Sequence, residues 1–416
     1  MGSKRVVVTG MGAITPIGNN LNDYKNSLYK GSSGCDNIKS FDITNFKTKF
    51  ACEVKGYDPL DYFDRKESRK MDKYAQFGMI AAAEAISDSN LDIDKLNLAR
   101  IGVIWGSGVG GIETFQNELI NFADNNKNPR FNPFFIPKLI PDICPGLIAI
   151  KYGFKGPNFA TVSACASASN AIIDSYNYIL SGTSDIIITG GSESAVNETG
   201  VGGFNALKAL SERNESPKTA SRPFDKERDG FVLGEGGGSL ILEDYDHALN
   251  RGAKIYAEII GFGMSCDAYH ITAPHPDGEG ARLVMENAIE SANIKKESVD
   301  YINVHGTSTP LGDKSEILAI QDVFKNHSYD LNISSTKSMT GHLLGAAGAI
   351  ESIASIFSIN KGQIPPTINH FTQDEEINSR LNLTLNKTQK RDVNIAMSNT
   401  FGFGGHNTSV VFKKFK

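Results

Sequence analysis

Short runs of branched apolar residues alternate with helical patterns along the whole chain, and this alternation restricts the fold more than any other feature. The runs at 5–10, 100–108, 184–191 and 238–244 are almost continuously apolar, which is typical of strands in a sheet that is covered on both faces. Segment 73–90 has the apolar spacing of a helix. The order of these elements predicts an α/β protein.

The second part of the chain repeats this order. Its strand-like runs lie at 253–263, 299–306, 331–338, 393–400 and 408–414. Two predicted helices, NAIIDSYNYILSG (170–182) and GAIESIASIFSINKG (348–362), both follow a strand and a turn of small residues, and both end at glycine. No low-complexity linker separates the two parts. We therefore predict a duplicated chain, with halves at 1–250 and 251–416 that form one compact unit.

A second internal similarity is harder to interpret. GAITPIGN (12–19) matches GTSTPLGD (306–313) more closely, letter by letter, than the two helices match each other. It pairs the first strand of one half with the second strand of the other half, so a chance match explains it equally well. The predicted duplication therefore rests on the two helices.

Composition and cysteine spacing weigh against several classes of protein. A net charge of −5 argues against a dedicated nucleic-acid-binding protein. The N-terminus has no apolar stretch long enough for a signal peptide, and no segment has the uninterrupted apolar length of a membrane span. The 5 cysteines are odd in number and lack the CxxC spacing of many metal and redox sites. We expect a cytoplasmic enzyme with reduced thiols.

Cys165 lies in TVSACASASN (161–170), where an extended segment at about 159–163 gives way to a helix. Free amide groups and the positive end of the helix dipole favour a thiolate there, so we expect the pKa of the thiol to fall below its ordinary value. Small neighbours leave room for a substrate, namely Ala164, Ala166, Ser167 and Ala168. From this segment alone, a buried cysteine that packs as a small apolar side chain is an equally good interpretation.

Three further loops carry reactive or aromatic side chains. They are VHGTSTPLGD with His305, STKSMTGHLLGAAGAIE with Lys337 and His342 on a glycine-rich turn, and FGFGGHN with two phenylalanines. A lone histidine in such a loop is more often a structural imidazole. Strand ends in open α/β sheets converge on one crevice, however, so several such loops together predict a shared site.

Taken together, these motifs resemble those of a known family. SACAS around Cys165, the three loops above, SNTFGFGG (398–405) and SRPFDKERDGFVLGEG (221–236) are similar to motifs of the β-ketoacyl-[acyl-carrier-protein] synthases of the thiolase-like superfamily. The similarity covers essentially the whole chain and is greatest to the type II elongating synthases. It implies a thiolase-like α/β fold, in which duplicated βαβαβαββ halves form a layered α-β-α-β-α architecture.

The resemblance implies decarboxylative Claisen condensation of an acyl group with a malonyl group, both carried on acyl carrier protein, in fatty acid chain elongation. Cys165 would attack the acyl thioester and hold the chain as a new thioester. Malonyl carrier protein would then lose carbon dioxide, and His305 and His342 would stabilise the enolate through their Nε2–H groups. By the same resemblance, Lys337 pairs with Glu351 and supports the site electrostatically rather than as a base.

Other roles carry over from the family's motifs. The backbone N–H groups of Cys165 and Phe403 would form the oxyanion hole. Thr307 and Thr309 would hold the phosphopantetheine arm, although turn hydrogen bonds are an alternative role for both hydroxyls. Phe401 and Phe403 would gate the acyl pocket, where the flanking glycines let the loop move. Core packing is a serious alternative for Phe401.

The resemblance also implies partners, but neither a metal nor a further cofactor, because the phosphopantetheine of acyl carrier protein carries the substrates. The family forms homodimers, and one ring of the PFF segment (133–135) would cross the interface while Val109 lines the acyl pocket. The carrier protein is acidic, so we expect it to dock on a local basic rim. The candidates for this rim are Lys66, Arg69, Lys70, Arg130 and Lys208. A charged stretch of this kind is otherwise a solvated helix face, and no nucleic acid or inserted membrane partner is expected.

The sequence departs from the family pattern at two positions. Ala168 stands where many relatives have glycine, and His406 stands in GGHN where others have threonine. The extra methyl group of Ala168 would narrow the pocket slightly. Neither change removes a catalytic group, and we assign His406 no catalytic role.

Several alternatives share part of this pattern. A biosynthetic thiolase needs a second catalytic cysteine in its C-terminal glycine loop, but the last cysteine here is Cys266. A chain-length factor would lack the nucleophile. A zinc site of Cys165, His305 and His342 has suitable ligand types without ligand-pair spacing, so we expect no metal. A ketosynthase of a polyketide or specialised acyl pathway would use the same residues, and the sequence leaves that alternative open.

Overall fold

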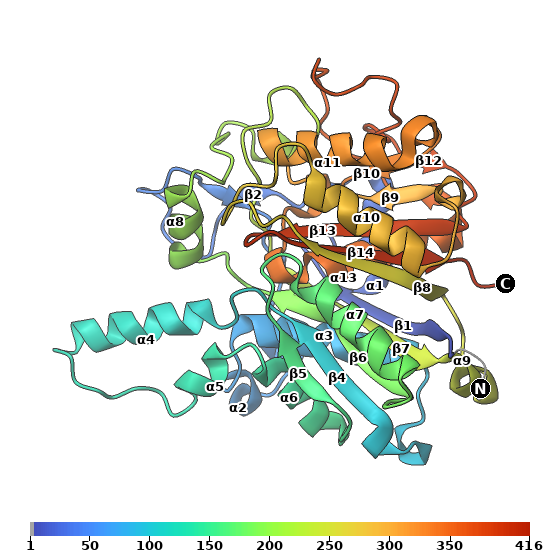
Figure 1. Cartoon of the computed structure of the whole chain (residues 1–416). Coiled ribbons are helices and arrows are strands. Elements are labelled where there is room, and N and C mark those ends of the chain that lie inside the picture. The colour runs from blue at the N-terminus through green and yellow to red at the C-terminus, as the bar shows by residue number, and fades with distance from the viewer. Residues whose placement is uncertain (1–3) are drawn as a thin grey trace.

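The structure, a computed structural model, describes residues 4–416, in which strands and helices alternate throughout (Figure 1). The strands of the main sheet are β1 (Val6–Ile14), β4 (Ile101–Gly106), β5 (Asn158–Thr161), β6 (Ile186–Glu193), β7 (Gly236–Asp244), β8 (Ala257–Cys266), β9 (Tyr301–Asn303), β10 (Asn332–Ser334), β13 (Ile395–Gly402) and β14 (His406–Lys413). Two short pairs lie outside it, β2 (Asp36–Asn37) with β3 (Phe50–Ala51) and β11 (Gln363–Ile364) with β12 (Gln389–Lys390).

The helices differ in length from one turn to more than four turns. Those before β8 are α1 (Leu21–Lys30), α2 (Arg65–Ser68), α3 (Lys73–Asp88), α4 (Ile112–Asp124), α5 (Phe135–Leu139), α6 (Ile143–Tyr152), α7 (Ser167–Leu180), α8 (Glu198–Ala206) and α9 (Tyr245–Asn250). Those after β8 are α10 (Glu279–Ser291), α11 (Pro310–Phe324), α12 (Lys337–Thr340) and α13 (Ala347–Lys361). No helix within residues 4–416 combines the length and apolar character needed to cross a membrane.

The main sheet shows the duplication directly. Its strand order is β10-β9-β13-β14-β8-β1-β7-β6-β4-β5. When the main-sheet strands of each half are counted along the chain, both halves have the third strand at the edge, followed by the second, fourth, fifth and first. In both halves the fifth strand is antiparallel to its two neighbours, and the second, third and fourth strands are parallel. The halves join where β1 pairs with β8 at residues 6–8 and 257–259.

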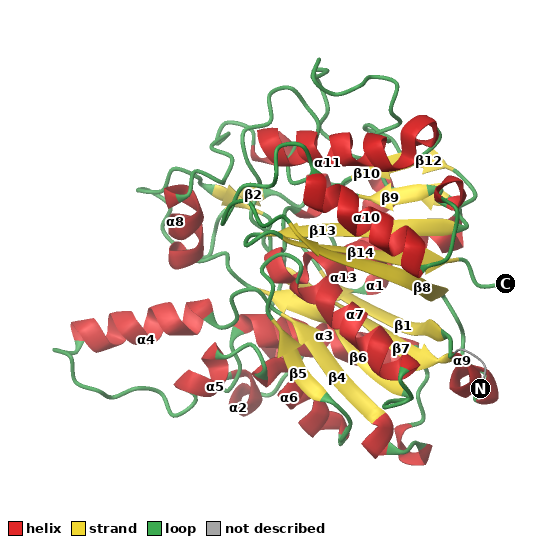
Figure 2. Cartoon of the chain, in the orientation of Figure 1, coloured by secondary structure: helices red, strands yellow, loops and turns green. Residues whose placement is uncertain are grey.

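Helices and strands form five layers around two central helices (Figure 2). α7 packs on β6 and β4 of its own half and on β14 of the other half. α13 packs on β13 and β9 of its own half and on β7 of the other half. On the outside, α3 and α6 cover strands of the first half, and α10 covers β8 and β14 with α11 beside it. This arrangement is the layered α-β-α-β-α architecture that the resemblance implies.

The two central helices are also the two whose sequences resemble each other. Each follows the third main-sheet strand of its half and precedes the fourth, so α7 and α13 occupy equivalent places. All residues from Ala347 to Ile359 of α13 are buried, because helices and strands of both halves surround it. By contrast, segments 12–19 and 306–313 follow first and second strands, which are not equivalent. The duplication predicted from the helices is confirmed, whereas the division at 250/251 stays a prediction.

One predicted strand is shorter than its apolar pattern. The segment 331–338 pairs in the sheet only over β10, and Lys337 begins the short helix α12. The N–H of Ser335 donates to Thr367 Oγ1 (3.0 Å) rather than to a strand, and Gly341 N closes a helical turn on Lys337 O (3.0 Å). The chain therefore leaves the sheet at Ser335 and turns Lys337 into the protein interior, where it is 1% exposed.

Candidate active site

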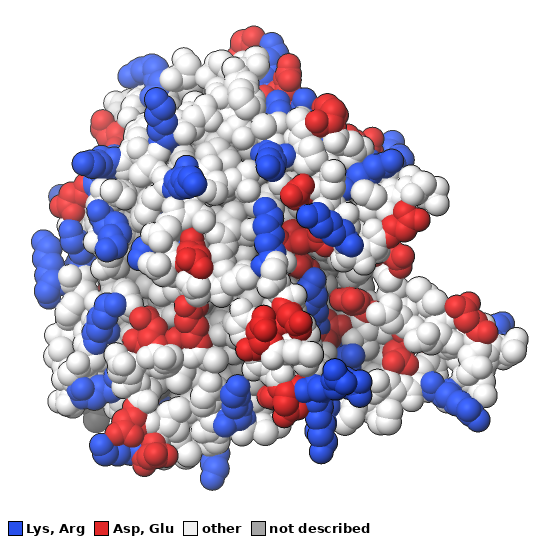
Figure 3. All heavy atoms as spheres, turned by 180° about the vertical axis from the view of Figure 1, so that it is seen from behind, with Lys and Arg blue, Asp and Glu red and all other residues white. Residues whose placement is uncertain are grey.

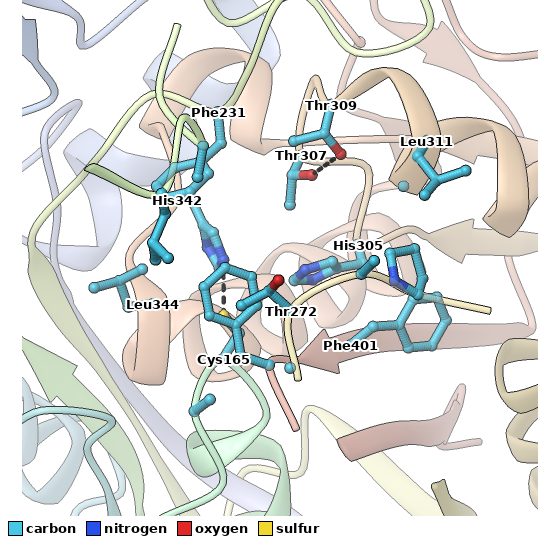
Figure 4. Close-up of a pocket in the computed structure, with 18 of the residues that line it drawn as sticks. Cys165, Phe231, Thr272, His305, Thr307, Thr309, Leu311, His342, Leu344 and Phe401 are labelled. Atoms are coloured by element: carbon cyan, nitrogen blue, oxygen red, sulfur yellow. Dashed lines mark hydrogen bonds between the residues drawn. The ribbon is translucent and has the colours of Figure 1, made fainter. Parts of the chain in front are cut away.

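The loops singled out from the sequence meet around one cavity of about 400 Å³ (Figure 4). Cys165 enters it from the segment between β5 and α7, His305 from just after β9, and His342 from the turn after α12. Phe401 reaches the cavity from the end of β13, and Phe403 from the turn before β14. The structure therefore brings side chains from both halves into one cavity.

Cys165 lies on a tight turn between β5 and α7. Ala164 has a φ of +49°, a left-handed conformation that residues other than glycine adopt uncommonly and at an energetic cost. Ser167 holds the turn, because its Oγ accepts a hydrogen bond from Ser163 N (3.0 Å) and donates one to Ala164 O (2.7 Å). The strained turn presents Cys165 to the cavity, although only 7% of the residue is exposed.

Cys165, His305 and His342 form a compact cluster. The Sγ atom of Cys165 lies 3.1 Å from Nε2 of His342. The rings of His305 and His342 are nearly perpendicular, with centroids 5.1 Å apart. Backbone hydrogen bonds hold His342, whose N–H donates to Val232 O (2.7 Å) and whose carbonyl accepts from Gly234 N (2.9 Å). One ligand atom from each of the three side chains lies within 4.8 Å of the other two.

Burial raises the pKa of the Cys165 thiol to about 12, so the prediction of a lowered pKa is wrong for this structure. The charge of Lys337 and a hydrogen bond from the Phe403 N–H oppose this rise without offsetting it. α7 begins at Ser167, with Ala166 as its N-cap, so the cysteine precedes the first turn, where the dipole acts most strongly. The Cys165 side chain is therefore a neutral thiol near pH 7.

Burial also lowers the pKa of His305 and of His342 well below the ordinary value, and the charge of Lys337 lowers both further. Both imidazoles are therefore neutral near pH 7. A neutral imidazole has one N–H donor, so each ring can donate to an oxyanion that forms in the cavity. The Nδ1 atoms of both rings are buried and make no hydrogen bond within residues 4–416, which leaves the tautomers free to change.

Lys337 and Glu351 form the buried ion pair that the resemblance implies, with the Lys337 ammonium donating to Glu351 Oε1. Each side chain is 1% exposed. Burial raises the pKa of Glu351 to about 7, and the nearby ammonium opposes that shift. Because the Lys337 charge also lowers the pKa values of Cys165 and both histidines, it acts on the cluster electrostatically.

Two further buried carboxylates support the site, and the sequence analysis misses both. Glu316 accepts hydrogen bonds from the backbone N–H groups of His305 (3.0 Å) and Gly306 (2.9 Å). Burial raises the pKa of Glu316 to about 7, and these N–H groups act against the shift. The only sign that the sequence offers is an acidic residue beside the apolar run ILAI, in the segment that forms α11.

Glu193 joins two walls of the cavity. Its carboxylate accepts from the N–H groups of Gly108 (2.6 Å), Val109 (3.1 Å) and Gly345 (3.0 Å), and from the hydroxyl of Ser107 (3.0 Å). A Cβ at Gly345 would lie 2.6 Å from a Glu193 oxygen and 2.2 Å from Gly108 N, so only glycine allows this approach. The sequence signal is a glutamate at the end of an otherwise uncharged strand, within TGGSES.

The predicted substrate-binding residues also lie around the cavity. Thr307 and Thr309 both line it, with their hydroxyl oxygens 3.0 Å apart, and Val109 lines its wall. The Phe401 ring lies 5.7 Å from the His305 ring, whereas the Phe403 ring packs 6.5 Å from Phe204. Their assigned roles in binding and gating stay predictions.

Only some of the residues predicted for the basic rim lie together in the structure. Lys66, Arg69 and Lys70 surround a shallow depression that Arg65 and Phe134 complete. Lys70 Nζ lies 5.7 Å from the centroid of the Phe134 ring. Seen from behind, basic side chains gather beside the base of the arm formed by α4 and α5 (Figure 3).

The other two candidates for the rim lie apart from this depression. Arg130 is exposed on the segment between α4 and α5. Lys208 follows α8 with a φ of +55°, between Leu207 and Ala209, which both line the cavity of Cys165. The structure therefore groups three of the five predicted residues, adds Arg65, and places Lys208 nearer to the catalytic cavity.

Comparisons with known proteins agree with this arrangement. Residues 3–248 match the family model of the beta-ketoacyl synthase N-terminal domain, and residues 256–371 match that of the C-terminal domain. The chain is 47% identical over 414 residues to the 3-oxoacyl-[acyl-carrier-protein] synthase 2 of Synechocystis sp., which covers 99% of each chain.

Solved structures share the fold over the full length. A beta-ketoacyl synthase from Burkholderia phymatum has a TM-score of 0.92 at 32% identity and covers 99% of this chain and 100% of that one. A ketosynthase in complex with its type II PKS acyl-carrier protein has a TM-score of 0.90 at 32% identity, with 100% of each chain covered. The chain belongs to the beta-ketoacyl synthase family of condensing enzymes.

Proposed function

We propose that the chain condenses an acyl group with a malonyl group, both carried on acyl carrier protein, during fatty acid elongation. The observation that carries this proposal is the placement of Cys165 against His342 and His305 in one cavity. The relative with 47% identity is a 3-oxoacyl-[acyl-carrier-protein] synthase 2, whereas the polyketide ketosynthase structure shares 32%. This difference favours fatty acid elongation over a specialised acyl pathway.

In the first step the acyl chain moves to Cys165. The sulfur attacks the thioester carbonyl, and His342 Nε2, 3.1 Å away, accepts the thiol proton. The bond from the carbonyl carbon to the phosphopantetheine sulfur breaks, and the departing sulfur takes the proton from His342. The N–H groups of Cys165 and Phe403 stabilise the oxyanion, and a hydrogen bond from the Phe403 N–H to the Cys165 sulfur supports this placement.

In the second step the malonyl group loses carbon dioxide. The bond between its α-carbon and its carboxylate breaks, and the electron pair forms an enolate. The neutral imidazoles of His305 and His342 donate hydrogen bonds to the enolate oxygen, and the positive charge of Lys337 adds to the stabilisation. The enolate carbon then attacks the acyl carbonyl carbon, the bond from that carbon to the Cys165 sulfur breaks, and the sulfur takes a proton from solvent to restore the thiol. Lys337 is paired with Glu351, which supports an electrostatic role rather than that of a base.

The residues around the cavity supply positioning. We infer that Thr307 and Thr309 hold the phosphopantetheine arm, that Val109 lines the acyl chain, and that Phe401 and Phe403 gate the acyl pocket. All five line the same cavity as Cys165, which supports these roles. The phosphopantetheine of the carrier protein then delivers both substrates, and the proposal needs no further cofactor.

Carrier protein would dock on the basic depression at α2. Lys66, Arg69 and Lys70 contribute three positive charges, Arg65 adds a fourth, and Phe134 adds an apolar contact. Arg130 and Lys208 would extend the contact along the arm and toward the cavity. Such a surface orients an acidic partner and increases its rate of association. A cytoplasmic location also belongs to this proposal.

A homodimer would cover the apolar surface that a single chain leaves open. β5 is an edge strand of the main sheet, and beside it Ile150 and Val162 are 78% and 62% exposed. The arm exposes further apolar side chains, namely Phe115, Leu119, Ile120, Phe131, Phe134 and Ile136. Open edges and large apolar patches are covered in most stable proteins. We therefore infer that a second copy pairs at β5, with one ring of Phe134 or Phe135 crossing the interface.

The test is mass spectrometry of the full-length protein after incubation with acyl carrier protein loaded with a fatty acyl chain. The wild type should gain one acyl group on Cys165, and Cys165→Ala should gain none. Cys266→Ser, which removes the exposed cysteine, is the matched control and should acylate normally. An adduct on another cysteine would refute the assignment. Condensation assays with a ladder of acyl chain lengths would then separate general elongation from a specialised pathway.

A further inference from the structure

We propose that Cys165, His305 and His342 also form a labile site for Zn²⁺ or a similar borderline-soft divalent cation. The sequence lacks ligand-pair spacing and predicts no metal at these residues, but the fold brings the three side chains together and reverses that expectation. Metal binding itself does not depend on the condensation reaction. A bound ion would also block acylation, because the same sulfur takes the acyl chain, and this consequence rests on the proposed function.

The geometry of the cluster is close to that of a zinc site. Zinc binds thiolate at about 2.3 Å and imidazole at about 2.0–2.1 Å, so ligand atoms of a tetrahedral site lie roughly 3.3–3.6 Å apart. The Sγ–Nε2 distance between Cys165 and His342 is 3.1 Å, and the longest separation within the cluster is at most 4.8 Å. If side-chain rotation moves the ligand atoms by about 1 Å, all three can reach one ion.

The ligand set suits the chemistry of this ion. One thiolate and two neutral imidazoles are ligands that Zn²⁺ prefers over oxygen donors. Binding would replace the thiol proton with the metal, so one sulfur–metal bond forms and one proton passes to solvent. A water molecule from the adjoining cavity can complete a fourth position, because three protein ligands leave that position open.

Two features of the surroundings make the site labile. The charge of Lys337, which influences all three side chains electrostatically, repels a cation. Metal-bound histidines usually donate their second ring N–H to an acceptor, but the buried Nδ1 atoms of His305 and His342 have no hydrogen-bond partner within residues 4–416. We therefore expect reversible binding that a chelator removes without unfolding the protein, in contrast to a structural zinc site.

The experiment measures metal binding to the full-length protein and uses Co²⁺ as the probe, followed by displacement with Zn²⁺. The wild type should bind one Co²⁺ ion in a saturable manner and show a sulfur-to-cobalt charge-transfer band in the near ultraviolet. Zn²⁺ should remove that band. Cys165→Ser, His305→Ala and His342→Ala should each weaken binding by more than about tenfold. Cys266→Ser should bind as the wild type does, because that thiol lies outside the cluster.

Each other outcome has a defined meaning. Equal binding by the wild type and by Cys165→Ser, or cobalt binding without the charge-transfer band, would overturn the site. If Cys165→Ser is misfolded by circular dichroism, wild-type protein alkylated at Cys165 replaces it, and unchanged binding after alkylation would also overturn the site. An enzyme that binds the metal but forms no acyl adduct would refute the proposed function and leave the site standing. An active enzyme without metal binding would refute only the site.

Discussion

Cys165 Sγ lies 3.1 Å from His342 Nε2, although the two residues are 177 positions apart in the sequence. The two groups come from different halves of the duplicated fold. Burial raises the pKa of the thiol and lowers that of the imidazole, so neither carries a charge at neutral pH. The pair is therefore a hydrogen-bonded thiol and base rather than a preformed ion pair, which has consequences that experiments can detect.

The pH dependence of Cys165 alkylation tests the charge of this pair. A thiol whose pKa is raised to about 12 holds little thiolate at neutral pH. The fraction of thiolate rises as pH increases, so the rate of iodoacetamide modification should rise about tenfold per pH unit from about pH 7 to 9 without a plateau. Peptide mass spectrometry would follow the modified Cys165. A plateau near neutral pH would instead indicate a thiolate paired with an imidazolium.

Replacing His342 should impair both chemical steps. His342→Ala removes one donor to the enolate, so release of carbon dioxide from malonyl carrier protein should fall by about 10²–10³-fold. Acylation of Cys165 should slow as well, because His342 Nε2 no longer accepts the thiol proton. His305→Ala is the matched comparison and should reduce decarboxylation similarly. Carbon dioxide release at the wild-type rate would remove either histidine from the enolate-stabilising role.

Breaking the Lys337–Glu351 pair should destabilise the protein in a pH-dependent way. Lys337→Met leaves a buried carboxylate without its cation, which typically costs about 3–5 kcal/mol of the free energy of unfolding. Stability from a carboxylate whose folded pKa is raised is lost as pH rises from the unfolded to the folded pKa. The folded pKa of Glu351 is about 7 with Lys337 present, and removing the ammonium raises it further, so the variant continues to lose stability above pH 7 while the wild type does not. The loss in Lys337→Met should therefore be larger at pH 8 than at pH 6, as measured by urea unfolding.

A double variant provides the control for that measurement. Lys337→Met combined with Glu351→Gln removes the buried charge, so stability should partly recover relative to Lys337→Met alone. The difference between pH 6 and pH 8 should shrink as well. An additive loss in the double variant would contradict a direct interaction between the two side chains.

Glu193 should matter for long acyl chains. Glu193→Gln keeps one acceptor oxygen but turns an NH₂ group toward backbone donors, so we expect a loss of about 1–3 kcal/mol in the free energy of unfolding. Because the Glu193 carboxylate no longer links the N–H groups of Val109 and Gly345, kcat/KM should fall more for long acyl chains than for short ones. Glu286→Gln, on an exposed helix surface, should change neither quantity. Equal losses for all chain lengths would argue against a role in shaping the pocket.

Charge reversal at α2 tests carrier docking. Lys66→Glu with Lys70→Glu should lower kcat/KM for acyl carrier protein by about tenfold at low salt, because favourable electrostatic steering is lost. Added salt should narrow the difference between wild type and variant. Activity with acyl-pantetheine, which lacks the protein, should not change. Lys387→Glu reverses the charge at an exposed position and tests whether a change in overall charge explains the effect. It should leave both activities intact.

The sequence by itself determined the elements and their order. Runs such as 184–191 and 238–244 became β6 and β7, because continuous apolar character and helical spacing are local properties of the chain. The likeness of segments 170–182 and 348–362 also predicted the duplication that the strand order confirms. The family motifs predicted that Cys165 is the nucleophile.

Only the tertiary structure decided how the reactive groups meet and how they ionise. The 3.1 Å contact between Cys165 and His342 depends on the order of strands across both halves, which no local pattern contains. The helix start near Cys165 suggested a low thiol pKa, but desolvation depends on every surrounding atom and reverses the direction. Glu193 remained hidden for the same reason, since its backbone partners Gly108 and Gly345 lie 85 and 152 positions away. Glu316 accepts from N–H groups only 10 and 11 positions away, but the path of the loop between β9 and α11 decides that contact.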